Sequence, residues 1–172
     1  MSRQTDFLQN EFWILSWNAS VQRAVSYRKQ SAGKERAEFR RYMIDYCERS
    51  ILPAYRSSIS EEEHVANIVA LRDAAQSYAG QRLLTKPYSI GVSQKLLNLQ
   101  LKYLWCADLR PMPPHCPIDR IVLGYTTLRN RMNWTKISDV GTYRQAIEAI
   151  RDVAGDKAIA LWELENYDRR RG

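Results

Sequence analysis

Lys95 and Asp119 are two residues whose types and surroundings could do chemistry together. Lys95 ends the glycine turn Gly91-Val92-Ser93-Gln94-Lys95 at the start of a helix-like segment. Asp119 follows a proline-rich loop, in Pro117-Ile118-Asp119, and opens another helix-like segment. Taken singly, such a lysine is usually a solvated residue and such an aspartate is usually a helix cap. Their order and context together favour a catalytic pair.

An amine beside a carboxylate is suited to nucleophilic catalysis, and the bond between a base and its sugar is one that such a pair can break. A neutral lysine amine attacks the sugar carbon and gives a Schiff base after the sugar ring opens. The amine must be partly desolvated, which the apolar neighbours Val92, Leu96, Leu99 and Tyr103 favour. The carboxylate stabilises positive charge on the sugar and can orient or deprotonate the nucleophile. Elimination at the phosphate can then nick the strand.

These motifs resemble the helix-hairpin-helix DNA glycosylase superfamily, in which members that cleave with a lysine share a Gly-Val-Gly-x-Lys turn and a later Pro-Val-Asp segment. The similarity covers roughly residues 89–123 and is to a compact, divergent member of the oxoguanine-glycosylase-like branch. It implies Lys95 as nucleophile and Asp119 as carboxylate. It also implies a helix-hairpin-helix-like element at about 80–107 and a catalytic aspartate loop at 108–123.

The hairpin departs from its relatives at two positions, because the usual Leu-Pro-Gly-Val-Gly reads Ser89-Ile90-Gly91-Val92-Ser93. The loop between the lysine and the aspartate is also longer. Three cysteines cannot supply the four-cysteine iron–sulfur cluster of some relatives, so no such cluster is expected. Cys106, His115 and Cys116 match no closed zinc pattern. We therefore expect no cofactor, although a monovalent cation at the hairpin is compatible with the resemblance.

A base-flipping enzyme also needs groups that hold phosphates and the extruded base. The backbone of the hairpin turn is the expected phosphate contact. Asn98 shares a helix face with Lys95 and belongs either to a cleft or to a polar stripe. Most aromatic residues at helical spacing are core, so only one or two are expected to touch the base. The candidates for contact with DNA or the base are Ile90, Gly91, Val92, Ser93, Asn98, Trp17, Asn18, Tyr88, His115 and Arg120.

The rest of the chain predicts helices, since no Val/Ile/Thr-rich alternating runs occur. We expect seven helices, and Ser60 with Glu63 forms a capping-box pattern at the third. Their expected ranges are about 6–28, 34–50, 61–80, 91–107, a short helix from 117 or 118, and two that follow Gly141 and Gly155. The expected fold is all-α: a single compact domain over residues 1–172, with two small lobes and a cleft, like a helix-hairpin-helix glycosylase.

The formal net charge of +7 suits a polyanionic partner, because basic residues that neutralise phosphates release counterions. The odd number of cysteines, Cys47, Cys106 and Cys116, suits a reduced chain. No signal-peptide pattern or membrane-length apolar run occurs in the sequence. A cytoplasmic monomer is therefore expected, with double-stranded DNA as its partner and no membrane association.

These features lead to a DNA glycosylase hypothesis with associated abasic-site lyase activity. The excised base would be an oxidised purine, or a hypermodified base of the kind phages place in their DNA, so the role is repair or antiviral defence. Two other classes stay open: a non-catalytic helical DNA-binding module and a helical protein-interaction domain.

Overall fold

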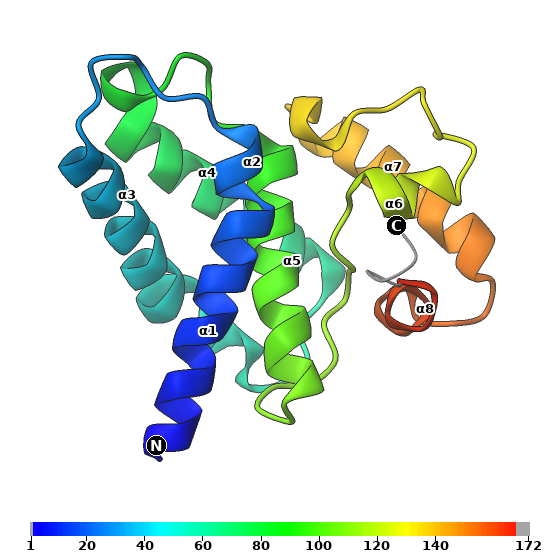
Figure 1. The fold of residues 1–172 in the computed structure, drawn as a ribbon. Helices are drawn as coiled ribbons and strands as arrows, with labels where there is room; N and C mark the ends of the chain where they lie inside the picture. Colours follow the sequence, from blue (N-terminus) through cyan, green and yellow to red (C-terminus); the bar gives the residue numbers. More distant parts are fainter. Residues whose placement is uncertain (1, 168–172) are drawn as a thin grey trace.

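The computed structural model describes residues 2–167, so Met1 and residues 168–172 of the predicted domain lie outside the described residues. Within residues 2–167 the regular structure is helical and no strand is found, which confirms the all-α class (Figure 1). Shorter turns are the π-helix η1 (Cys47–Ile51) and the 3-10 helices η2 (Leu52–Arg56) and η3 (Trp134–Lys136). The α-helices are α1 (Arg3–Ala19), α2 (Val21–Ala24), α3 (Gly33–Tyr46), α4 (Glu61–Leu83), α5 (Ile90–Cys106), α6 (Arg120–Gly124), α7 (Val140–Ala154) and α8 (Ile159–Asn166).

Each of the seven predicted helices is present, but the boundaries of several differ from those predicted. The first helix does not continue to Arg28: it breaks at Ser20, whose hydroxyl donates to the Ser16 carbonyl at 2.5 Å, and α2 ends at Ala24. The helix expected from 117 or 118 begins only at Arg120, because Asp119 is its N-cap. Helix α4 extends to Leu83, although Gly80 inside it has non-helical dihedral angles.

Helix α5 lies at the centre of the molecule. Every residue from Ile90 to Lys102 is buried, as expected of a helix packed on all sides. It contacts α1, α2 and α4 on one side and η3 and α7 on the other, and Figure 1 shows it between these two groups. The polar residues along α5 are buried with it, and burying a polar group is costly unless it is hydrogen-bonded inside the protein. The contacts of these residues define the candidate site.

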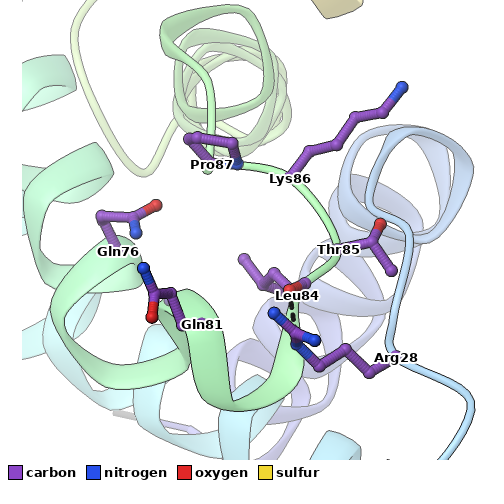
Figure 2. Close-up of a pocket in the computed structure, with 8 residues that line it drawn as sticks. Arg28, Gln76, Gln81, Leu84, Thr85, Lys86 and Pro87 are labelled. Atoms are coloured by element: carbon purple, nitrogen blue, oxygen red, sulfur yellow. Dashed lines mark hydrogen bonds between the residues drawn. The ribbon is translucent and has the colours of Figure 1, made fainter.

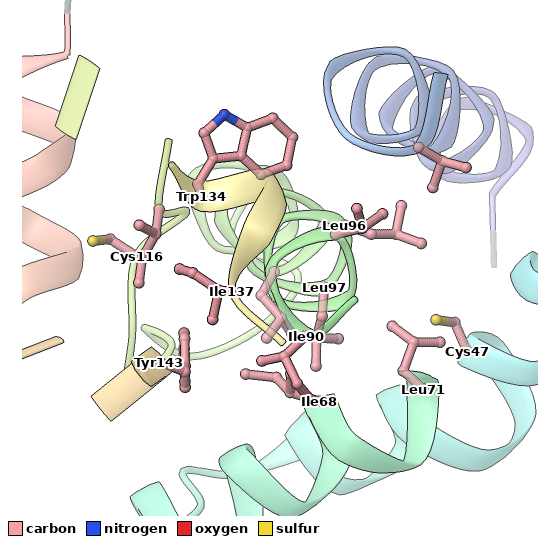
Figure 3. Close-up of a cluster of buried hydrophobic side chains, with 14 of the residues drawn as sticks. Cys47, Ile68, Leu71, Ile90, Leu96, Leu97, Cys116, Trp134, Ile137 and Tyr143 are labelled. Carbon is pink, nitrogen blue, oxygen red and sulfur yellow. The ribbon is translucent and has the colours of Figure 1, made fainter. Parts of the chain in front are cut away.

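The two groups of helices share one hydrophobic core. Figure 3 shows Leu71 and Cys47 on one side of α5, and Trp134, Ile137 and Tyr143 on its other side. The core continues to Trp162 of α8. Two groups of helices are thus packed against a common central helix.

A buried ion pair joins α8 to α5. The ammonium of Lys102 lies 2.6 Å from Oε2 of Glu163, and both side chains are largely inaccessible. Burial raises the pKa of Glu163, and the Lys102 charge opposes that rise. Removing either partner would leave a buried charge uncompensated, which is strongly unfavourable. The pair therefore stabilises α8 against the centre of the fold.

Side-chain caps start most of the helices that surround the site. The predicted capping box of α4 is confirmed, since Ser60 Oγ accepts from Glu63 N–H and the Glu63 carboxylate accepts from Ser60 N–H. Ser89 caps α5 and Asp139 caps α7. These caps fix where each helix begins and hence which side chains face the centre.

Within residues 2–167, none of the helices combines the length and apolar character needed to cross a membrane.

Candidate active site

Lys95 and Asp119 lie in direct contact, although 24 positions separate them in the sequence. The Nζ atom of Lys95 is 3.2 Å from Oδ2 of Asp119, and the two side chains are only 6% and 13% exposed. Lys95 is the sixth residue of α5, which begins at Ile90, one residue before the predicted start. An amine and a carboxylate held this close, away from bulk water, can exchange a proton.

The two oxygens of Asp119 have different partners. Oδ1 accepts hydrogen bonds from the backbone N–H groups of Ile121 at 2.8 Å and Val122 at 3.1 Å, which makes Asp119 the N-cap of α6. Oδ2 faces Lys95. The cap and the catalytic interpretation are therefore compatible, since the cap holds the carboxylate in place while one oxygen remains for the amine.

Gln94 positions the segment that carries Asp119. Its side-chain amide donates from Nε2 to the Ile118 carbonyl at 2.9 Å, and its Oε1 accepts from the Ile118 N–H at 3.0 Å. The same Nε2 donates to the Gly91 carbonyl at 2.9 Å. Gln94 is completely buried, so these bonds are shielded from water. They tie the backbone immediately before Asp119 to the first turns of α5.

Trp134 covers the amine of Lys95. The Nζ atom lies 4.3 Å from the centroid of the indole ring, within the range of a cation–π interaction. The indole and the carboxylate thus contact the same amine from two different segments. On the side of the indole, a substrate atom would therefore have to displace the Trp134 ring to reach Nζ.

Gly91 lets the Trp134 segment approach α5. A Cβ atom at position 91 would lie 1.7 Å from the Trp134 carbonyl oxygen, which no side chain could tolerate. The Gly91 N–H donates to the Ile137 carbonyl at 2.9 Å, and Ser89 Oγ donates to the Thr135 carbonyl at 3.2 Å. Glycine at this position therefore serves close packing of η3 on α5.

The backbone N–H groups that were predicted to contact phosphate are buried at the start of α5. Ile90, Gly91, Val92 and Ser93 are all buried. The Val92 N–H donates to Ser89 Oγ, and the Ser93 N–H donates to the Ser89 carbonyl. Together with the bond from Gly91, these backbone donors are engaged within the protein.

Asn98 and His115 belong to a buried polar network beside the pair. Asn98 Nδ2 donates to Gln94 Oε1 at 3.3 Å and lies 3.5 Å from the Tyr143 hydroxyl. The Tyr143 hydroxyl is 2.8 Å from Nδ1 of His115. The network therefore runs from Gln94, next to the candidate site, to the His115 ring.

The network also contains His64, whose ring meets that of His115 edge to face with centroids 4.8 Å apart. Its Nδ1 lies 2.7 Å from the Tyr55 hydroxyl. Burial lowers the pKa of His64 to about 3, and the nearby His115 contributes. Burial likewise lowers the pKa of His115 to about 3, with the charges of Arg151 and Arg144 contributing. Both imidazoles are therefore neutral near pH 7.

The remaining four candidates do not form one site. Trp17 and Tyr88 are buried and each packs edge-on against Phe39 in the core. Asn18 is exposed at the end of α1, and Arg120 is exposed immediately after Asp119. Of these four, only Arg120 adjoins the Lys95–Asp119 pair in the chain.

Gln94 and Trp134 are the site residues that sequence reasoning missed. Gln94 belongs to the glycine-turn motif, and its position immediately before Lys95 could have identified it as a site residue. Trp134 had none, because only the folded chain brings η3 over α5. Across residues 2–167, no group of three or more His, Cys, Asp or Glu side chains is arranged to hold a metal ion.

Comparisons of the chain with protein-family models, with curated proteins and with solved structures found no match.

Proposed function

We propose that the protein is a DNA glycosylase that removes a modified base with Lys95 as nucleophile and Asp119 as its carboxylate partner. The observation that carries the proposal is the 3.2 Å contact between Lys95 Nζ and Asp119 Oδ2, with both side chains largely buried. The bonds from Gln94 to the Ile118 backbone support it, since they preorganise the aspartate relative to the lysine. The resemblance of both motifs to lysine-dependent glycosylases supplies the reaction class.

In the proposed reaction Asp119 accepts a proton from the Lys95 ammonium, so that the amine carries a lone pair. Nζ then forms a bond to the sugar carbon C1′ while the bond from C1′ to the base breaks. The electron pair of that bond leaves with the base, which takes up the proton that Asp119 accepted. The carboxylate is then ionised again and stabilises the positive charge left on the substituted amine.

The aminal formed on C1′ then opens to a Schiff base. The ring oxygen leaves C1′ with its electron pair and gains a proton, and Nζ forms the double bond to C1′. Loss of a C2′ proton expels the 3′ phosphate and nicks the strand. Asp119 Oδ2 can take a proton from the substituted amine and pass it to the ring oxygen, so the pair serves both halves of the reaction.

Trp134 controls access to the amine in this proposal. Because its ring lies over Nζ, the indole must move before the sugar can reach the lysine from that side. A displaced indole offers a flat apolar surface on which an extruded base can stack. The substrate is an oxidised purine or a bulkier phage-type modified base, and release of free base from a panel of such DNAs would distinguish them.

Borohydride trapping tests the role of Lys95. The protein is incubated with duplex DNA that carries an oxidised purine, a phage-type modified base or an abasic site, and the Schiff base is reduced to a stable adduct. We expect the adduct with the native protein and with Lys34→Ala, a change of an exposed lysine on α3. We expect none with Lys95→Ala or with Lys95→Gln, which keeps a polar group beside the buried carboxylate.

Other results would redirect the proposal. An adduct that persists in both Lys95 variants would assign the nucleophile to another amine. Salt-sensitive DNA binding without adduct or base release would identify a non-catalytic DNA-binding module. Absence of any salt-sensitive affinity for DNA would favour a protein-interaction domain.

A further inference from the structure

A second polar feature lies at the turn between α4 and α5, outside the Lys95–Asp119 pair. It is a cavity of about 430 Å³ whose polar lining comes from Arg28, Gln76, Gln81, Thr85 and Lys86, and we refer to it as the Arg28 pocket. Figure 2 shows Gln76 and Gln81 on the α4 side, Lys86 and Pro87 on the opposite side, and Arg28 below. Its volume falls within the range of pockets that hold small ligands or parts of larger ones.

The lining of the Arg28 pocket is rich in hydrogen-bond donors and contains no carboxylate. Arg28 and Lys86 bring positive charge, and Gln76 and Gln81 bring amides. The Gln76 Oε1 already accepts from the Tyr88 N–H at 2.8 Å, so its Nε2 donor is the group that remains for a ligand. Two cationic groups and amide donors without an acidic neighbour match an anion, and a planar guanidinium is well suited to phosphate.

The backbone holds the Arg28 pocket in one shape. Residues 26–28 pair with residues 83–85 through an antiparallel bridge between Tyr27 and Leu84. The Arg28 N–H donates to the Leu83 carbonyl at 2.9 Å, and the Thr85 N–H donates to the Ser26 carbonyl at 3.0 Å. The guanidinium is oriented by its Nε, which donates to the Leu84 carbonyl at 3.1 Å, as drawn in Figure 2. A preorganised wall lowers the entropy that a ligand must overcome on binding.

A smaller cavity of about 150 Å³ extends the Arg28 pocket toward the candidate active site. It shares Lys86 and Pro87 with the pocket, and its far side is formed by Val92, Thr135 and Lys136. Thr135 and Lys136 directly follow Trp134, the residue that covers Lys95. Arg28, Lys86 and Lys136 therefore line two adjoining cavities, and the second lies against the segment that covers the amine.

We propose that the Arg28 pocket binds a phosphate group of the DNA backbone, on the strand whose nucleotide is presented to Lys95. The identity of the ligand as DNA rests on the proposed function. The preference for an anion does not, because it follows from the donors of the pocket. The pocket takes the role that the engaged N–H groups of the hairpin turn cannot fill.

The test compares DNA binding by variants that place a carboxylate in the pocket with matched changes elsewhere. Gln81→Glu and Lys86→Glu alter exposed residues of the lining, and neither side chain makes a hydrogen bond that folding would lose. The controls are Gln4→Glu and Arg3→Glu, which make the same charge changes on exposed residues at the far end of α1 (Figure 1). Affinity for a fluorescein-labelled duplex with an abasic-site analogue is measured by anisotropy over a range of salt concentrations.

We expect both pocket variants to bind DNA roughly 5- to 10-fold more weakly than the native protein, with the dependence of log Kd on log salt reduced by about one unit in Lys86→Glu. The two control variants should change affinity much less. Pocket variants that bind DNA as the controls do would overturn the inference.

Titration with inorganic phosphate alone distinguishes the source of the anion. If phosphate raises the Tm of the native protein but not of Gln81→Glu, while DNA affinity is unchanged, the site is for a free phosphate and the DNA assignment is wrong. Borohydride trapping at saturating DNA separates this inference from the proposed function. Weaker DNA binding in the pocket variants supports the pocket even if no adduct forms with any protein.

Discussion

Asp119 shows how one side chain can serve structure and chemistry together. Its Oδ1 accepts two backbone hydrogen bonds at the start of α6, and its Oδ2 contacts the Lys95 amine. A charged cap contributes about 1 kcal/mol to stability, and the same contacts orient its second oxygen. Because each role belongs to a different oxygen, a substitution can remove the charge beside Lys95 and still leave the cap.

Asp119→Asn should remove the chemistry and keep the fold. The amide oxygen can still accept the N–H groups of Ile121 and Val122, but the negative charge beside Lys95 is lost. We expect base release to fall by about 100-fold or more, with the thermal midpoint close to that of the native protein. Asp139→Asn is the matched control, since Asp139 caps α7 in the same manner. Base release by Asp119→Asn at the rate of this control would contradict the proposed role.

Gln94 is the uncharged residue whose substitution should disturb the Lys95–Asp119 pair most. Gln94→Met keeps the approximate volume but leaves the Ile118 N–H and carbonyl without their buried partners. We expect a loss of roughly 2–4 kcal/mol in the free energy of unfolding, measured with urea, together with weaker borohydride trapping. Gln145→Met on the exposed face of α7 is the control. Unchanged stability would mean that the Ile118 groups find other partners.

At the scale of elements, the contact between α5 and η3 places the Trp134 ring against the Lys95 amine. The 3-10 turn η3 carries Trp134 and comes close to α5 only because residue 91 has no side chain. The hydrogen bonds from Gly91 and Ser89 to the η3 segment complete that contact. The glycine of the motif thus affects the site through packing, one turn before the lysine.

Gly91→Ala should be far more damaging than the same substitution elsewhere. The new methyl group would overlap the Trp134 carbonyl, so the backbone of α5 or η3 must shift, and we expect a loss of about 2 kcal/mol or more in the free energy of unfolding. Gly33→Ala is the control, because a Cβ at the start of α3 meets nothing within 4 Å. There we expect a change within about 1 kcal/mol, in the stabilising direction. Equal effects at the two positions would argue against close packing as the reason for Gly91.

At the scale of the whole molecule, the buried network of His64, His115 and Tyr143 joins the two groups of helices through α5. His64 belongs to α4, Tyr143 to α7, and His115 to the loop before α6. Neutral imidazoles are needed in this network, since burial lowers the pKa of both histidines to about 3. The association of the two groups therefore depends on pH.

Stability should fall as the pH is lowered from about 6.5 toward 3. In that window the unfolded chain binds protons at both histidines, whereas the native protein does not until the pH approaches the lowered pKa. The slope of unfolding free energy against pH is therefore positive, and each histidine accounts for a loss of roughly 3 kcal/mol by about pH 4.5. Urea unfolding at a series of pH values measures this slope.

His64→Gln provides the comparison for the pH dependence, because it removes one titrating group and keeps a polar side chain. We expect the variant to be less stable near neutral pH and to lose less stability on acidification than the native protein. Parallel pH profiles for the two proteins would show that carboxylates such as Asp139, whose pKa is lowered by its hydrogen bonds to Thr142, dominate the acid response instead.

The sequence by itself determined the helical class and the approximate positions of the helices. These follow from local physics: periodic burial, caps such as Ser60, and residues that end helices. The choice of Lys95 and Asp119 came instead from the resemblance of their motifs to a known family. The break at Ser20 and the late start of α6 were missed, since they depend on side-chain hydrogen bonds that periodicity does not reveal.

Only the tertiary structure decided what surrounds the pair. Burial of α5 on all sides forces its polar residues to find partners far away in the sequence, which is why Gln94 binds Ile118, Asn98 contacts Tyr143 and Lys102 pairs with Glu163. The same packing places Trp134 on Lys95 and draws the hairpin N–H groups into internal bonds. The local sequence shows which residues are polar, whereas the close packing of the interior determines which of them contact one another.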